Sequence, residues 1–171
     1  MTRPFPKALI FDLDGTLADS QLDFEAMRAE MELPAGQPIL EALAHLPPLR
    51  AARCHDILHR HELEGAARAT LLPGAAELFT AIARLGWRTA IATRNSREIT
   101  ATTLRKLGLS VELVMTRDDG PVKPDPWAVQ HVCQQWGVSP AEVVVIGDYK
   151  FDIESGRAAG RTWCAADRRT P

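Results

Sequence analysis

Short apolar runs alternate with longer amphipathic segments along most of the chain. Runs at 8–11, 89–92, 111–115 and 143–146 are each followed by polar residues, and 162–166 is a candidate edge strand. Apolar runs of this length between turn residues are typical of buried strands, whereas the longer segments have helical periodicity. The pattern predicts an α/β fold with a parallel sheet of about five strands between two layers of helices.

Local signals mark several of the expected element ends. Gly86, Gly108 and Gly137 each follow a predicted helix, as is common where a helix ends. Ser96 is a suitable N-cap for the helix that ends at about residue 107. The β-branched run 143–146 is expected to be a strand buried on both faces.

The segment 19–72 interrupts this alternation with helical periodicity over roughly fifty residues, which is long for an ordinary connection. Two short helical stripes separated by prolines lead into a longer amphipathic segment at 49–69. We therefore predict an α/β core that contains a small helical insert, with the core formed by residues 1–18 and 73–171 and the insert by residues 19–72.

The composition is that of an ordinary globular protein, with 46% hydrophobic and 25% charged residues. A formal net charge of −2 gives no electrostatic reason to expect nucleic acid or an anionic membrane as a partner. Cys54, Cys133 and Cys164 are odd in number and widely spaced, which favours free thiols over a disulfide framework. No long apolar segment opens the chain, so we predict a cytoplasmic protein without a signal peptide or membrane span.

Two carboxylates, Asp12 and Asp14, stand where the first strand ends. Alternate residues of a strand share a face, so both carboxylates can point the same way. Two like charges about 4 Å apart repel by roughly 4 kcal/mol at an effective dielectric constant of about 20, and a hard cation such as Mg²⁺ would offset this. A simple hairpin turn at Asp14-Gly15 is the alternative. An EF-hand is excluded because Gly15 occupies the fourth loop position instead of the sixth.

Polar residues also follow the other predicted strands. Thr93, next to Arg94, lies between a strand end and a helix start, where free backbone N–H groups favour a phosphate. Lys123 is held extended by Pro124 at a helix entrance, and Asp148 and Asp152 bracket the turn after 143–146. Parallel strands present their carboxyl ends at one edge, so these loops are expected to converge on one site.

A second candidate site lies in the insert. His55 and His59 are four residues apart and could share a helical face as zinc ligands. No second pair of ligands is evident elsewhere in the sequence, so polar-face histidines or substrate contacts are the favoured interpretation.

The complete set of motifs resembles the haloacid dehalogenase-like hydrolase superfamily, in particular its phosphoglycolate phosphatase-like branch. DLDGT at residues 12–16, Thr93, Lys123 in KPDP and GDxxxD at 147–152 match the four motifs of that family in order. The resemblance covers essentially the whole chain. It implies a Rossmann-like three-layer core, with a helical cap at the position of residues 19–72.

The resemblance also implies residue roles. Asp12 would be the nucleophile that becomes an aspartyl-phosphate, and Asp14 would be the general acid and base. The phosphoryl oxygens would be held by Thr93, Arg94 and Lys123. Mg²⁺ would be the cofactor, bound by the carboxylates of Asp12 and Asp148 and by the backbone carbonyl of Asp14. Asp152 would orient these ligands or bind the ion through a water molecule.

The expected activity is a Mg²⁺-dependent phosphatase acting on a small phosphorylated metabolite of the phosphoglycolate or sugar-phosphate type. A phosphomutase and a catalytically idle binding module remain as alternatives. Tyr149 stands where the family often has a small residue, and it would either crowd the metal shell or face outward. The chain ends soon after the last strand, so the exposed edge could be protected by a partner, as in a homodimer.

Overall fold

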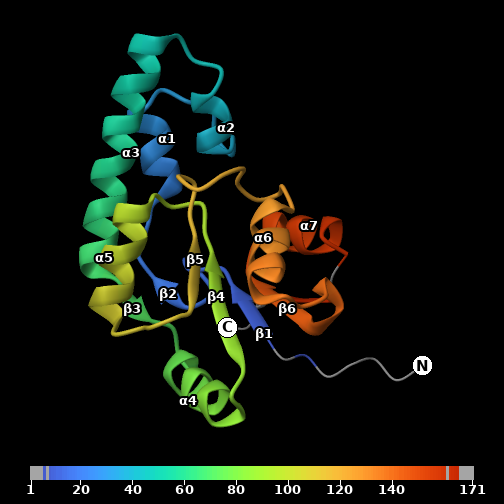
Figure 1. Ribbon diagram of the computed structural model, residues 1–171. Coiled ribbons are helices and arrows are strands. Elements are labelled where there is room, and N and C mark those ends of the chain that lie inside the picture. The colour runs from blue at the N-terminus through green and yellow to red at the C-terminus, as the bar shows by residue number, and fades with distance from the viewer. Residues whose placement is uncertain (1–5, 7, 161, 166–171) are drawn as a thin grey trace.

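The fold is a five-stranded sheet between two layers of helices, seen in a computed structural model (Figure 1). The structure describes residue 6, residues 8–160 and the backbone of residues 162–165. All neighbouring strands are parallel, in the order β5-β4-β1-β6-β7. The strands are β1 (Ala8–Phe11), β4 (Arg88–Ala92), β5 (Leu113–Met115), β6 (Val143–Gly147) and β7 (Thr162–Ala165).

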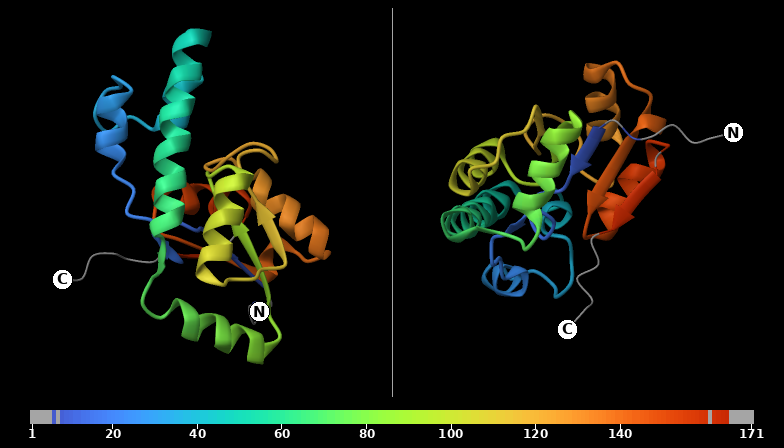
Figure 2. Two further views of the ribbon diagram at one scale, coloured as in Figure 1. Left: turned by 90° about the vertical axis from the view of Figure 1, so that its left-hand side faces the viewer. Right: turned by 90° about the horizontal axis from the view of Figure 1, so that it is seen from below.

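Helices cover both faces of the sheet because successive β1 residues point to opposite sides. Leu9 and Phe11 pack with the apolar residues of α4 (Ala75–Leu85) and α5 (Arg97–Leu107), while Ile10 packs with those of α6 (Trp127–Trp136). The helix α7 (Lys150–Ala158) contacts β6 and β7, and the short 3₁₀ helix η1 (Pro140–Glu142) precedes β6. Figures 1 and 2 show α6 and α7 on the side of the sheet opposite α5. The predicted three-layer α/β class is therefore confirmed.

Most predicted element ends agree with the structure to within one or two residues. The Ser96 Oγ accepts a hydrogen bond from the Ile99 N–H at 3.3 Å, as expected of an N-cap. The expectation that residues 143–146 are buried on both faces is only partly correct. Val143 and Val145 are buried, whereas Val144 and Ile146 are half-buried because the α4 and α5 layer covers that face less completely.

The inserted segment forms a helical unit beyond the carboxyl ends of the strands (Figure 1). It contains α1 (Phe24–Glu30), α2 (Ile39–Leu43) and the long α3 (Pro48–Arg68). These helices share an apolar cluster that is separate from the two clusters of the sheet. The cluster consists of Met27, Met31, Ile39, Leu43, Cys54, Ile57 and Leu58. The exact division into a core and a cap at residues 19–72 stays a prediction.

A two-stranded antiparallel ribbon connects this helical unit to the sheet. It pairs β2 (Ala18–Asp19) with β3 (Thr70–Leu71). In contrast, β1 pairs with β4 and β6, both of which are parallel to it. The alternative that Asp14-Gly15 is a simple hairpin turn is therefore wrong.

Three further expectations concern single residues and membrane spans. Cys54 and Cys133 are buried thiols that take part in no disulfide among the described residues, and the side chain of Cys164 lies outside the described part. Phe24 and Leu63, at apolar positions of the predicted helical stripes, are 49% and 41% exposed. Within the described ranges, no helix has both the length and the apolar character needed to cross a membrane.

Candidate active site

The carboxyl ends of β1, β4 and β6 meet beneath the helical unit, at the point where the chain crosses from one half of the sheet to the other. Such crossing points are where ligands bind in open α/β sheets. A cavity of about 490 Å³ lies between this edge and the helices. All seven sequence-predicted site residues line it: Asp12, Asp14, Thr93, Arg94, Lys123, Asp148 and Asp152.

Lys123 bridges two carboxylates at the floor of the cavity. Its Nζ donates to the Asp12 Oδ1 at 2.6 Å and to the Asp152 Oδ1 at 2.5 Å, and the Lys123 side chain is only 5% exposed. Burial raises the pKa of Asp12 to about 7 even though the ammonium of Lys123 opposes the shift. For Lys123 burial lowers the pKa, but attraction to Asp12 and Asp152 outweighs it, so the net shift is upward.

Three carboxylates form a cluster that suits a hard cation. Oxygen atoms of Asp12, Asp148 and Asp152 lie within 4.8 Å of one another, and no other such group occurs among the described residues. Gly15 closes over this cluster, since a Cβ added there would lie 2.2 Å from the Asp148 Oδ2. Oxygen-only donor sets of this kind fit Mg²⁺. The histidines of α3 form no comparable group, and His59 instead lies 3.9 Å from the Glu98 carboxylate.

The Asp14 carboxylate is turned to a separate pair of donors. It accepts hydrogen bonds from the Ser20 Oγ at 2.5 Å and from the Asn95 Nδ2 at 2.6 Å. Ser20 and Asn95 are both buried. Neither residue was among the candidates from the sequence. The position of Asn95 in the strand-end loop beside Thr93 is a weak signal that could have indicated it.

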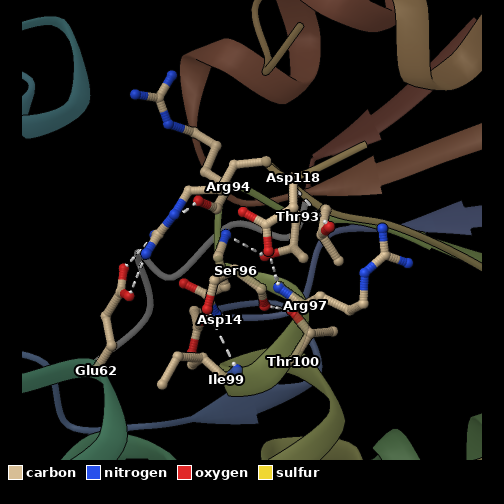
Figure 3. Close-up of polar contacts among 12 residues, drawn as sticks. Asp14, Glu62, Thr93, Arg94, Ser96, Arg97, Ile99, Thr100 and Asp118 are labelled. Atoms are coloured by element: carbon tan, nitrogen blue, oxygen red, sulfur yellow. Dashed lines mark hydrogen bonds and ion pairs between the residues drawn. The ribbon is translucent and has the colours of Figure 1, made fainter. Parts of the chain in front are cut away.

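Thr93 and Arg94 follow β4 but have different surroundings. Thr93 is buried in the lining, and its Oγ1 accepts a hydrogen bond from the Asn95 N–H at 3.2 Å. Arg94 extends away from Asp14 (Figure 3) and donates to the Glu41 Oε2 of α2 at 2.6 Å and to the Lys123 carbonyl oxygen. The structure thus does not bring the Arg94 guanidinium together with the carboxylate cluster.

Asp152 and Tyr149 together shape the turn into α7. The Tyr149 N–H donates to the Asp152 Oδ2 at 3.0 Å, so Asp152 uses one oxygen for this turn and the other for Lys123. The Tyr149 ring is 51% exposed and packs edge-on against Phe151 at 5.0 Å between ring centroids. Tyr149 also lines the cavity, so both alternatives for its ring stay predictions.

This fold and this site define a class of α/β proteins with a carboxylate cluster at the carboxyl edge of a parallel sheet. A family model of haloacid dehalogenase-like hydrolases matches residues 31–160. The chain is 30% identical to a phosphoglycolate phosphatase of Cupriavidus necator, over 92% of this chain and 79% of that protein. It is 32% identical to the N-acetylmuramic acid 6-phosphate phosphatase of Pseudomonas aeruginosa, over 94% of this chain and 81% of that protein.

A solved structure of CbbY from Rhodobacter sphaeroides in complex with phosphate has the same fold. The TM-score is 0.74 at 22% identity, and the match covers 98% of this chain and 90% of that one. The chain belongs to the haloacid dehalogenase-like hydrolase family, which confirms the family resemblance seen in the sequence motifs.

Proposed function

We propose that the protein is a Mg²⁺-dependent phosphatase that hydrolyses a small phosphorylated metabolite through an aspartyl-phosphate on Asp12. One observation carries this proposal. The buried Lys123 ammonium bridges Asp12 and Asp152, which together with Asp148 form the carboxylate cluster of the cavity. Two relatives of the chain are named phosphatases of phosphoglycolate and of a sugar phosphate, which supports the same reaction class.

Asp12 and Asp148, with the carbonyl of Asp14, would hold the magnesium ion. When bound, Mg²⁺ supplies positive charge that offsets the charge of the phosphoryl group and of the carboxylates. The Asp152 carboxylate already accepts hydrogen bonds from Lys123 and from the Tyr149 N–H. We therefore assign Asp152 mainly to positioning Lys123.

The first half of the reaction forms a bond between an Asp12 carboxylate oxygen and phosphorus. The bond from phosphorus to the alcohol oxygen breaks, and the electron pair leaves with that oxygen. Lys123 lies 2.6 Å from Asp12, where its charge can hold both the nucleophile and a phosphoryl oxygen. Thr93 is proposed to donate to another phosphoryl oxygen from the end of β4.

Asp14 is proposed to transfer a proton in both halves of the reaction. It protonates the leaving alcohol oxygen, and it then takes a proton from the water that attacks phosphorus and releases Asp12. The donors Ser20 and Asn95 hold its carboxylate in a fixed orientation. The helical unit formed by residues 19–72 is proposed to act as a cap that limits access of bulk water.

The test is phosphate release from a panel of phosphate monoesters, with and without Mg²⁺. Asp12→Asn should lower release by at least about a thousandfold because it removes the nucleophile. Asp56→Asn, the same chemical change at an exposed position of α3, is the matched control and should keep full activity. Equal release by wild type and Asp12→Asn would refute the mechanism, and absence of release from every ester would refute the phosphatase.

A further inference from the structure

The wall of the cavity away from the carboxylate cluster is largely apolar. Phe24 of α1 is 49% exposed although it is a large apolar side chain, and it lies in this lining. Exposed apolar surface inside a cavity is available for contact with a ligand. The apolar residues of this wall are Leu22, Phe24, Ile39, Leu40, Leu58 and Phe151.

Three cationic side chains line the cavity within the described ranges, namely Lys123, Arg94 and Arg28. Lys123 lies at the carboxylate cluster and is needed there for the phosphoryl group. Among the lining residues, recognition of a second anionic group on a substrate would therefore depend on Arg28 or Arg94. Lys150 is not part of the lining, although its Nζ lies 5.3 Å from the centroid of the Phe151 ring.

The guanidinium of Arg28 is already occupied by protein acceptors. Its Nη2 and Nε donate to the two carboxylate oxygens of Glu25 at 2.5 Å and 3.2 Å. Its Nη1 donates to the Gln37 carbonyl oxygen at 3.2 Å. This two-pronged contact with a carboxylate offsets the charge of Arg28, and with the Gln37 carbonyl it engages three of the five N–H donors.

Arg94 is also paired with a carboxylate, but through a single oxygen. Its Nη2 donates to the Glu41 Oε2 at 2.6 Å, and its Nη1 donates to the Lys123 carbonyl oxygen. One face of the guanidinium lies over the Phe151 ring, 4.6 Å from the ring centroid. A ligand carboxylate would have to displace Glu41 to reach this charge.

The wall also contains carboxylates, so its cationic side chains are not in excess over its anionic ones. Glu62 is buried and is neutralised by Arg117, whose Nη1 and Nη2 lie 2.6 Å and 2.8 Å from its two oxygens. Asp19 also lines the cavity, and its Oδ1 accepts a hydrogen bond from the Gln21 N–H at 3.1 Å. An anionic group entering this wall would lose hydration without gaining a cationic partner.

We propose that the enzyme selects phosphate monoesters whose alcohol part is uncharged and partly apolar, and that it discriminates against an alcohol part that carries a carboxylate or a second phosphate. The inference rests on the proposed phosphatase function of the same site. The Glu25–Arg28 and Glu41–Arg94 pairs are the elements that withhold positive charge from the substrate. The specificity would thus differ from that of an enzyme for phosphoglycolate.

The test compares kcat/KM for phenyl phosphate and 4-carboxyphenyl phosphate, which differ by one carboxylate. A second pair, phosphoglycolamide and phosphoglycolate, repeats the comparison with a small leaving group. We expect the neutral member of each pair to be preferred by about tenfold or more, as is usual when a charge is desolvated without a partner.

Two variants test the assignment to the ion pairs. Glu25→Gln and Glu41→Gln free a guanidinium in the wall, so each should reduce the preference for the neutral ester several-fold. Glu64→Gln is the control, because Glu64 pairs with Arg60 and Arg68 on α3 and lies outside the cavity lining. This variant makes the same change of charge and should leave the ratio unchanged.

The outcomes separate the inference from the proposed function. Hydrolysis that favours the carboxylated esters, or treats both members of each pair equally, would overturn the inference while the phosphatase stands. An unchanged ratio in both Glu25→Gln and Glu41→Gln would overturn the role of the two ion pairs. Absence of Mg²⁺-dependent release from any ester of the wider panel would overturn the phosphatase itself, and the inference with it.

Discussion

Gly15 meets two requirements that no residue with a Cβ can meet at once. Its φ angle is +85°, and a Cβ would lie 2.2 Å from the Asp148 Oδ2. Gly15→Ala should therefore displace Asp148, lower Mg²⁺ affinity at least about tenfold and cost about 1–2 kcal/mol of stability through the left-handed backbone alone. Calorimetric Mg²⁺ titration and denaturant unfolding measure the two effects.

Gly74→Ala provides a matched control for this prediction. Gly74 has a φ angle of +84°, but no atom outside its own neighbourhood lies within 4 Å of the added Cβ. It should therefore have the same backbone strain while Mg²⁺ affinity stays unchanged. Equal Mg²⁺ affinities for the Gly15→Ala and Gly74→Ala variants would show that the close approach to Asp148 does not matter.

Proton binding to Asp12 should compete with metal binding. Burial raises the pKa of Asp12 to about 7, so this carboxyl is protonated below that pH and ionised above it when no metal is bound. Because a metal requires the carboxylate, the apparent Mg²⁺ affinity should fall by up to about tenfold for each pH unit below the pKa of Asp12 and level off above it.

Calorimetry between pH 6 and pH 8.5 measures this dependence. Titrations near neutral pH in buffers with different ionisation enthalpies should also reveal a proton released as Mg²⁺ binds. An affinity that is constant across this range, with no proton release, would contradict a raised pKa at Asp12.

At the scale of elements, one buried ion pair joins α3 to the loop that follows β5. Glu62 and Arg117 form two hydrogen bonds, and their side chains are only 6% and 17% exposed. Removing one member leaves a buried charge unpaired, so Glu62→Gln or Arg117→Met should each lower the free energy of unfolding by about 3 kcal/mol. The double variant should lose less than the sum of the two.

A double-mutant cycle by denaturant unfolding isolates this coupling. The exposed Arg60–Glu64 pair on the same helix is the comparison, since its 3.9 Å contact is open to solvent. Glu64→Gln should change stability little, because water screens exposed pairs. Additive losses at Glu62 and Arg117 would show that α3 is not held to the sheet by this pair.

Whether a helix or strand could be predicted from the sequence depends on whether neighbouring or distant residues determine it. Periodicity and local end signals such as Ser96 indicated the sheet strands and the helices, because these depend on neighbouring residues. The ribbon formed by β2 and β3 was not predicted. Each strand has two residues, and its pairing joins segments far apart in the chain. The strand β1 does not continue into a hairpin, because its two neighbours in the sheet are β4 and β6.

At the scale of the whole molecule, topology explains why the convergence of the candidate residues on one cavity could be predicted, while the contacts made by the helical unit could not. The candidates of the main site all lie in loops that follow strands, and parallel strands bring their carboxyl ends together. The candidates His55 and His59 lie instead within a helix of the insert. The contact of Arg94 with Glu41, 53 residues away in α2, depends on how the helical unit sits over the sheet. No local pattern encodes that arrangement.

The ribbon of β2 and β3 has a consequence for how this chain can diversify. The helical unit leaves and re-enters the sheet at adjacent points, because Ala18 lies opposite Leu71. A segment whose two ends meet can be lengthened, shortened or exchanged without changing the strand order around it. Exchange of this segment would replace the Glu25–Arg28 pair, the Glu41 partner of Arg94 and most of the apolar wall, and would leave Asp12, Lys123 and Asp148 where they are. New substrate ranges can thus arise by recombination at one junction while the inherited chemistry is retained.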